Sequence, residues 1–131
     1  MKVGLCYPTP VLDDGTQVFD AAILPALKRA TNAALLRVNL DHRSPINDNI
    51  VHASRDAGFE VLPILEPDYT GSIDPHVYAE WCLAMVERYH FPVVELGNEP
   101  WTIHRMPAEQ YARYVSMAGA MLRQAATPIV I

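Results

Sequence analysis

Most of the residues able to do chemistry in this chain stand just after short apolar segments. They are Tyr7; Arg37, Asn39, Asp41 and His42; Glu66, Asp68 and Tyr69; and Asn98, Glu99, Trp101 and His104. Carboxylates and amides exchange hydrogen bonds with hydroxyl groups, and flat aromatic rings stack on the faces of sugars. Together these residue types favour a carbohydrate ligand.

The elements that must position these residues alternate along the chain. Short β-branched or leucine-rich runs predict strands over residues 2–7, 34–40, 60–65, 93–97 and 127–131. Longer segments of helical period predict helices over residues 19–31, 46–57 and 75–89, with a fourth opened by Pro107. This alternation is typical of βαβ units, so we expect an α/β fold with a parallel sheet.

Local signals predict where several elements begin and end. Asp74 is expected as the N-cap of the third helix, with Pro75 at its first position, and Pro25 within the first turn of the first helix. Gly58 is expected to end the second helix in a left-handed conformation. Pro63 removes a ladder donor from the third strand, which we therefore expect to be less regular.

The spacing of the strands suits either a doubly wound sheet or a (β/α)8 barrel of about 250 residues. A doubly wound sheet usually has a glycine-rich phosphate turn after its first strand, but residues 7–10 read YPTP, and the sequence contains neither GxGxxG nor GxxxxGK. We therefore expect a partial TIM barrel with about four βα units plus a fifth strand. It would form one domain over residues 1–131, the N-terminal half of a barrel, ending in an apolar edge strand.

The segment Val93–Trp101, VVELGNEPW, resembles the Asn-Glu-Pro motif at the end of the fourth barrel strand in the clan A glycoside hydrolases. The resemblance implies a retaining glycosidase in which Glu99 is the general acid/base and Asn98 binds the 2-hydroxyl of the sugar. It also implies that Arg37, on the second strand, supports the catalytic carboxylates. The resemblance covers the order of elements along the whole chain, whereas its specific motifs cover only a small part.

A retaining glycosidase needs two carboxyl groups about 5 to 5.5 Å apart, one to protonate the leaving oxygen and one to attack the anomeric carbon. The resemblance gives Glu99 the first role, and burial near Trp101 and a second negative charge would raise the pKa of its carboxyl group. Strict strand alternation would place Asn98 and Glu99 on opposite faces. We therefore expect the backbone to bend around Gly97.

For several candidate residues a structural role is the alternative to a functional one. An unpaired buried carboxylate is costly, so Glu95 is expected to be structural and paired with Arg37, which then serves either that ion pair or the substrate. The alternative for Glu99 itself is a structural role, in which it caps a βα loop or forms a salt bridge there. Trp81 and the tyrosines of the last helix are expected in the core or on helix faces. The remaining candidate substrate contacts are His42, Tyr69 and Trp101.

The resembled family carries its nucleophilic Glu on the seventh strand, and only five strands are predicted here, so we expect an isolated monomer to be inactive. One alternative is that the chain is a fragment of a longer hydrolase. Another is a homodimer that closes one barrel about a two-fold axis, with Glu66 of one copy acting as nucleophile opposite Glu99 of the other. A third is a non-catalytic half-barrel that binds carbohydrate or self-associates as a scaffold.

Composition argues against several other functions. Half of the 131 residues are apolar, which is typical of a globular domain, and the formal net charge is −5. The ten basic residues are scattered, so neither nucleic acid nor a membrane surface is an expected partner. No signal peptide is evident, which makes the cytoplasm the default location. Cys6 and Cys82 are expected to be buried free thiols, and no metal or cofactor is expected.

Overall fold

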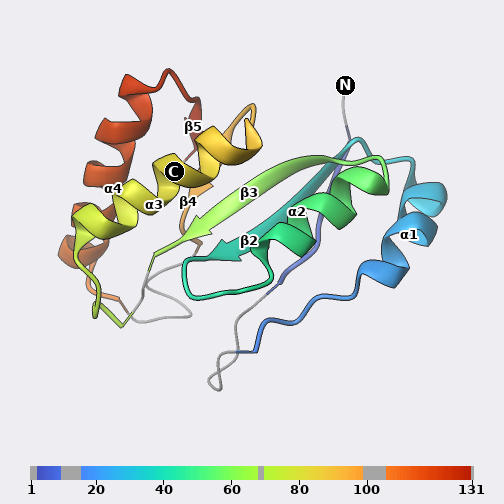
Figure 1. Ribbon diagram of the computed structural model, residues 1–131, viewed down its shortest axis with the longest axis horizontal. Coiled ribbons are helices and arrows are strands. Elements are labelled where there is room, and N and C mark those ends of the chain that lie inside the picture. The colour runs from blue at the N-terminus through green and yellow to red at the C-terminus, as the bar shows by residue number, and fades with distance from the viewer. Residues whose placement is uncertain (1–2, 10–15, 68–69, 99–105, 131) are drawn as a thin grey trace.

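The computed structural model describes residues 3–9, 16–67, 70–98 and 106–130. Its strands are β1 (Gly4–Cys6), β2 (Leu35–Asp41), β3 (Glu60–Glu66), β4 (Val94–Leu96) and β5 (Ile129–Val130). Its helices are η1 (Ala21–Ile23), α1 (Leu24–Thr31), α2 (Asn47–Asp56), α3 (Pro75–Tyr89) and α4 (Ala108–Gln124). All neighbouring strands are parallel, in the order β1-β2-β3-β4-β5 (Figure 1). The predicted α/β fold with a parallel sheet is confirmed.

The two faces of the sheet differ in what covers them. Helix α2 packs on β2 and β3, α4 contacts β4, and α3 packs along α4 (Figure 1). On the helix-covered face, the strand side chains with almost no exposed surface are Leu36, Val38, Leu40, Val61, Leu65, Val94 and Leu96, and Ile64 on the other face of β3 is also buried. Alternate residues of the same strands are partly exposed: Leu35, Arg37, Asn39, Glu60, Leu62 and Glu95. Since strand side chains alternate between faces, these residues, among them the polar Arg37, Asn39 and Glu95, occupy the face opposite the helices.

Strand β3 runs regularly through Pro63, which corrects the expected irregularity. Neighbouring residues of a parallel strand direct their backbone groups to opposite neighbours. The N–H of Glu60 donates to Ala34 at the start of β2, and the carbonyl of Leu65 accepts from Gly97 after β4. Pro63 therefore faces β4, where the ladder begins only at Ile64, so its missing N–H breaks no bond with β2.

The helix ends agree with most of the local signals. The Asp74 side chain accepts a 2.7 Å hydrogen bond from the N–H of His76, and α3 begins at Pro75 as predicted. Gly58 has a φ of 88° after α2. The predicted first helix starts late, because Asp20 caps the short helix η1 before α1 begins. Pro107 is the N-cap of α4 rather than its first residue.

The two cysteines have different surroundings. Cys82 on α3 is a buried free thiol, as expected. Cys6 on β1 is free but exposed, which corrects the prediction that both are buried. The reason is its place on the face of the sheet that the helices leave uncovered, where its sulfur accepts a hydrogen bond from Arg37.

Two tyrosines attach the helical layer to the ends of the central strands. The hydroxyl of Tyr78 on α3 donates to the carbonyl of Leu65 at 2.7 Å, and that of Tyr111 on α4 donates to the carbonyl of Leu96 at 2.6 Å. Leu65 and Leu96 are register partners in the ladder between β3 and β4. Both bonds therefore act at the same level of the sheet. In the described part of the chain, no helix has the length and apolar character needed to cross a membrane.

Candidate functional site

Strands β2, β3 and β4 bring several of the predicted site residues together near the carboxyl ends of β3 and β4. Arg37, Glu66 and Asn98 are described, with Glu95 between them on β4. The predicted acid/base Glu99 and the predicted substrate contacts Tyr69 and Trp101 lie outside the described residues.

Arg37 reaches from β2 across β3 to β4. Its Nε donates to Oε2 of Glu95 at 2.8 Å, and its Nη2 donates to Oε1 of the same carboxylate at 2.6 Å. The same Nη2 also donates to Oδ1 of Asn98 at 3.1 Å. The bond with Glu95 raises the pKa of the guanidinium further above its ordinary value. The expected pairing of Arg37 with Glu95 is confirmed, and one guanidinium links this pair to Asn98.

The chain turns sharply where β4 ends. Gly97 has a φ of 72°, a conformation that side chains with a Cβ rarely adopt. Its N–H still donates to the carbonyl of Leu65 on β3 at 2.9 Å, so the turn begins directly at the ladder. The predicted bend at Gly97 is confirmed. It lets Asn98 reach Arg37 on the same face as Glu95.

Tyr111 completes this turn, and it was missed by the sequence-based reasoning, which assigned the tyrosines of α4 to the core or to helix faces. A Cβ added to Gly97 would lie 2.8 Å from Cε2 and 3.0 Å from the hydroxyl of Tyr111. Burial raises the pKa of the Tyr111 hydroxyl, and the charges of Glu66 and Glu95 raise it further. The phenol therefore stays protonated beside two carboxylates. No local sequence signal marks this residue, because its place depends on the distant end of β4.

Glu66 at the end of β3 is only 7% exposed and accepts a hydrogen bond from the side-chain amide of Asn39 on β2. Asn39 is fixed by Thr9: the Thr9 hydroxyl donates to the Asn39 carbonyl at 2.6 Å and accepts from its N–H at 3.0 Å. Gln17 donates from Nε2 to both carbonyls, at 2.7 Å to Thr9 and 3.0 Å to Asn39. Glu66 is thus oriented through a network that reaches Thr9 and Gln17 in the segment after β1, and neither residue was predicted to take part.

His42, a predicted substrate contact, lies against the helical layer. Its ring packs edge-on to Trp81 of α3 with 6.2 Å between the ring centroids. Its Nδ1 lies 3.6 Å from the carboxylate of Asp41, which also pairs with Arg43 at 2.7 Å. The His42 side chain retains 16% of its surface exposed. These contacts give His42 a packing role beside Trp81.

We call Arg37, Asn39, Glu66, Glu95, Asn98 and Tyr111 the strand-end cluster. Hydrogen bonds join Arg37 to Glu95 and Asn98, and Asn39 to Glu66. The charges of both glutamates raise the pKa of the Tyr111 hydroxyl. Fixed amides and carboxylates of this kind suit the recognition of hydroxyl groups. Among the described residues no group of three or more His, Cys, Asp or Glu has the arrangement of a metal site.

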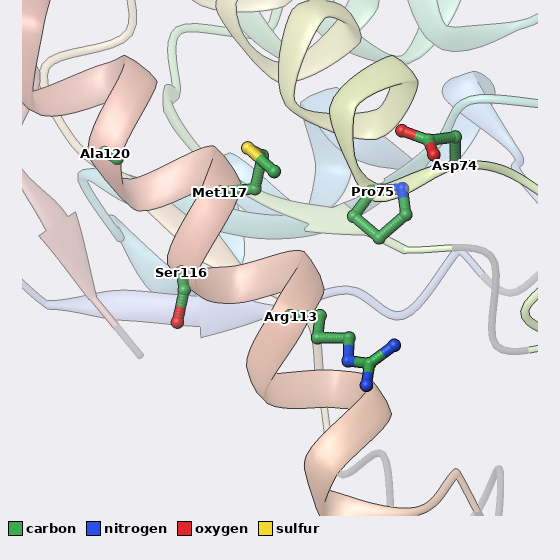
Figure 2. A pocket seen from close by; sticks show the side chains of 6 residues that line it. All are labelled: Asp74, Pro75, Arg113, Ser116, Met117 and Ala120. Atoms are coloured by element: carbon green, nitrogen blue, oxygen red, sulfur yellow. The ribbon is translucent and has the colours of Figure 1, made fainter.

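A separate hollow of about 480 Å³ lies between the start of α3 and the middle of α4 (Figure 2). It is lined by Asp74, Pro75, Arg113, Ser116, Met117 and Ala120. These residues belong to helices or to a helix cap, so the hollow is a feature of the helical layer and lies apart from the strand-end cluster.

Comparison of the chain with protein-family models, curated proteins and solved structures gives no match. The strand-end cluster and the motif that continues from Asn98 in the sequence are therefore the features that indicate a function.

Proposed function

We propose that this chain carries the proton-donating half of a retaining glycosidase site, with Glu99 as the general acid/base. One observation carries the proposal: Arg37 pairs with Glu95 through two hydrogen bonds while holding Oδ1 of Asn98, the residue directly before Glu99. A half-buried ion pair and a bent strand end both cost folding free energy, and a loop that only connects two elements needs neither. They are useful where an amide and a carboxyl group must face one sugar.

The order of the strands supports a barrel-type arrangement. A doubly wound sheet reverses its strand order at the switch point, whereas the strands of a (β/α)8 barrel follow the order of the sequence. The five parallel strands here are in sequence order. This favours the N-terminal half of a (β/α)8 barrel, with the strand-end cluster at the carboxyl ends of the strands, where barrel enzymes carry their reactive groups.

Each described residue then has a role that follows from its contacts. Arg37 holds Oδ1 of Asn98, which leaves the amide nitrogen as the donor that Asn98 presents to the sugar 2-hydroxyl. Glu95 neutralises the charge of Arg37, so the guanidinium orients Asn98 without lowering the pKa of Glu99, which must stay raised for a proton donor. Arg37 therefore serves both of the roles that the sequence left as alternatives.

The second carboxylate of the reaction is the nucleophile, and the resemblance places it on a seventh strand. An external anion replaces it in a direct test. Azide attacks the anomeric carbon, the bond from that carbon to the aryl oxygen breaks, and Glu99 gives its proton to the departing oxygen. A glycosyl azide of inverted configuration and a phenol are formed.

The experiment measures glycosyl azide formation by the full chain from paired aryl glycosides of common hexoses and pentoses, in both anomeric configurations. A phenyl leaving group needs the proton, whereas a dinitrophenyl group departs without it. We expect Glu99→Gln to slow the phenyl substrate by about 10²- to 10⁴-fold and to spare the dinitrophenyl substrate. Asn98→Asp is the matched control, because it keeps the size of the side chain but removes the amide donor, and it should slow both.

Two results would overturn the proposal. One is an equal effect of Glu99→Gln on both leaving groups, because a proton donor acts only where a proton is needed. The other is sugar binding with no azide product from either substrate, measured by titration calorimetry with the same glycosides. That result would support the alternative of a non-catalytic carbohydrate-binding half-barrel.

A further inference from the structure

The end of β4 is held from the helical side by one side chain. The hydroxyl of Tyr111, from the first turn of α4, donates to the carbonyl of Leu96 at 2.6 Å, and Leu96 is the last residue of β4. The Tyr111 ring lies where a Cβ of the next residue, Gly97, would stand. The absence of a Cβ at Gly97 therefore leaves the room that the Tyr111 ring fills.

The opposite side of the same turn is held by the sheet and by Arg37. The N–H of Gly97 donates to Leu65 on β3, and Oδ1 of Asn98 accepts from Nη2 of Arg37. Three successive residues are thus fixed by three different elements: α4 at Leu96, β3 at Gly97 and β2 at Asn98. Of these three hydrogen bonds, the one from Tyr111 comes from a helix, and the other two come from strands of the sheet.

We infer that Tyr111 is a positioning residue of the proposed glycosidase site, holding the turn at Gly97 so that Asn98, the residue directly before the proposed acid/base Glu99, stays bonded to Arg37. The catalytic part of this inference rests on the proposed function, whereas the hold on the turn does not. A tyrosine hydroxyl is protonated in the neutral range, and burial and the two neighbouring glutamates raise its pKa further, so Tyr111 remains a donor to Leu96.

The hold on the turn is tested with Tyr111→Phe, which removes the hydroxyl and keeps the ring against Gly97. Tyr114→Phe is the matched control, because its hydroxyl also donates to a backbone carbonyl, that of Ile73 at 2.7 Å, one turn along the same helix. Loss of one such bond should speed amide hydrogen exchange at Gly97 about tenfold in Tyr111→Phe and leave it unchanged in Tyr114→Phe. The side-chain amide resonances of Asn98 should shift only in Tyr111→Phe. Unchanged exchange and unchanged Asn98 resonances would overturn the inference.

The catalytic part is tested by azide-dependent turnover of the same two variants. Displacement of Asn98 should slow both glycosides, as expected for Asn98→Asp, whereas poorer proton delivery by Glu99 slows only the phenyl glycoside. Tyr111→Phe should therefore slow the phenyl glycoside about tenfold more than the dinitrophenyl glycoside. Tyr114→Phe should affect neither. An equal loss with both leaving groups would show a merely structural role and overturn the positioning role. If the unaltered chain forms no azide product, the proposed function fails, and the exchange measurement alone then decides whether Tyr111 holds the turn.

Discussion

The guanidinium of Arg37 on β2 forms two hydrogen bonds with the carboxylate of Glu95 on β4, although the whole of β3 lies between the two strands. The pair spans the sheet on the face that the helices leave uncovered. Its side chains are 28% and 18% exposed, so water screens the charges only in part. The pair therefore couples two strands that do not touch through their backbones.

A double-mutant cycle should measure this coupling. Arg37→Met and Glu95→Gln each leave one partner without its counterpart, whereas the double variant removes both. We expect a coupling free energy of about 1 to 3 kcal/mol in urea unfolding. Arg37→Lys should recover only part of it, because an ammonium group cannot make the two-point contact. Additive losses in the cycle would show that the pair contributes nothing to folding.

Two glycines with positive φ differ in the space around them, which predicts different costs for alanine. A Cβ at Gly58 would meet only the flexible end of Lys28 at 3.6 Å, so Gly58→Ala should cost about 1 to 2 kcal/mol from backbone conformation. A Cβ at Gly97 would meet Tyr111 at 2.8 Å, and Gly97→Ala should cost about 2 to 4 kcal/mol. Thermal or urea unfolding measures both, and equal losses would contradict the close contact with Tyr111.

Local signals in the sequence correctly predicted the helix ends that neighbouring residues determine. The start of α3 at Pro75 follows from Asp74, whose carboxylate accepts from the N–H of His76, and the end of α2 follows from Gly58. The parallel sheet and the pairing of Arg37 with Glu95 also followed, the latter because a carboxylate in the middle of a strand needs a cation nearby.

Features set by distant packing were not predictable in the same way. Whether Tyr111 joins the core or the site depends on where β4 stops, and nothing near Tyr111 in the sequence records that position. Cys6 was expected to be buried because apolar strands usually are. Its exposure follows from the uncovered face of the sheet, which is a property of the whole layer arrangement.

The buried thiol of Cys82 predicts a loss of stability at alkaline pH. Burial raises its pKa in the folded chain to about 12, whereas in the unfolded chain it ionises near about 8.5. The stabilising contribution is therefore complete below the unfolded value and is lost as the pH rises towards the folded value, by at most about 1.4 kcal/mol per pH unit. Urea unfolding between pH 8 and 11, roughly the span of these values, should show a shallower decline in Cys82→Ala. Cys6→Ala is the control, because Cys6 is exposed, and a decline as shallow as that of Cys82→Ala would contradict the assignment.

Glu66 distinguishes the two sources of a nucleophile. In a barrel closed by two copies, each site combines Glu99 of one chain with Glu66 of the other. Glu99→Gln and Glu66→Gln would each abolish turnover without azide. A mixture of the two variants, unfolded and refolded together, would regain about a quarter of the activity, because half of the dimers are mixed and half of their sites are intact.

A nucleophile supplied by further strands makes the opposite prediction. The chain would then be a monomer without azide-independent turnover, and no mixture of variants would gain activity. Light scattering gives the mass, and the mixing experiment gives the function. The structure supplies a reason to test Glu66 in particular: its carboxylate is fixed by Asn39 at the end of β3, level with Gly97, and it lies close enough to raise the pKa of Tyr111. A dimer in which Glu66→Gln left turnover unchanged would rule out the shared barrel.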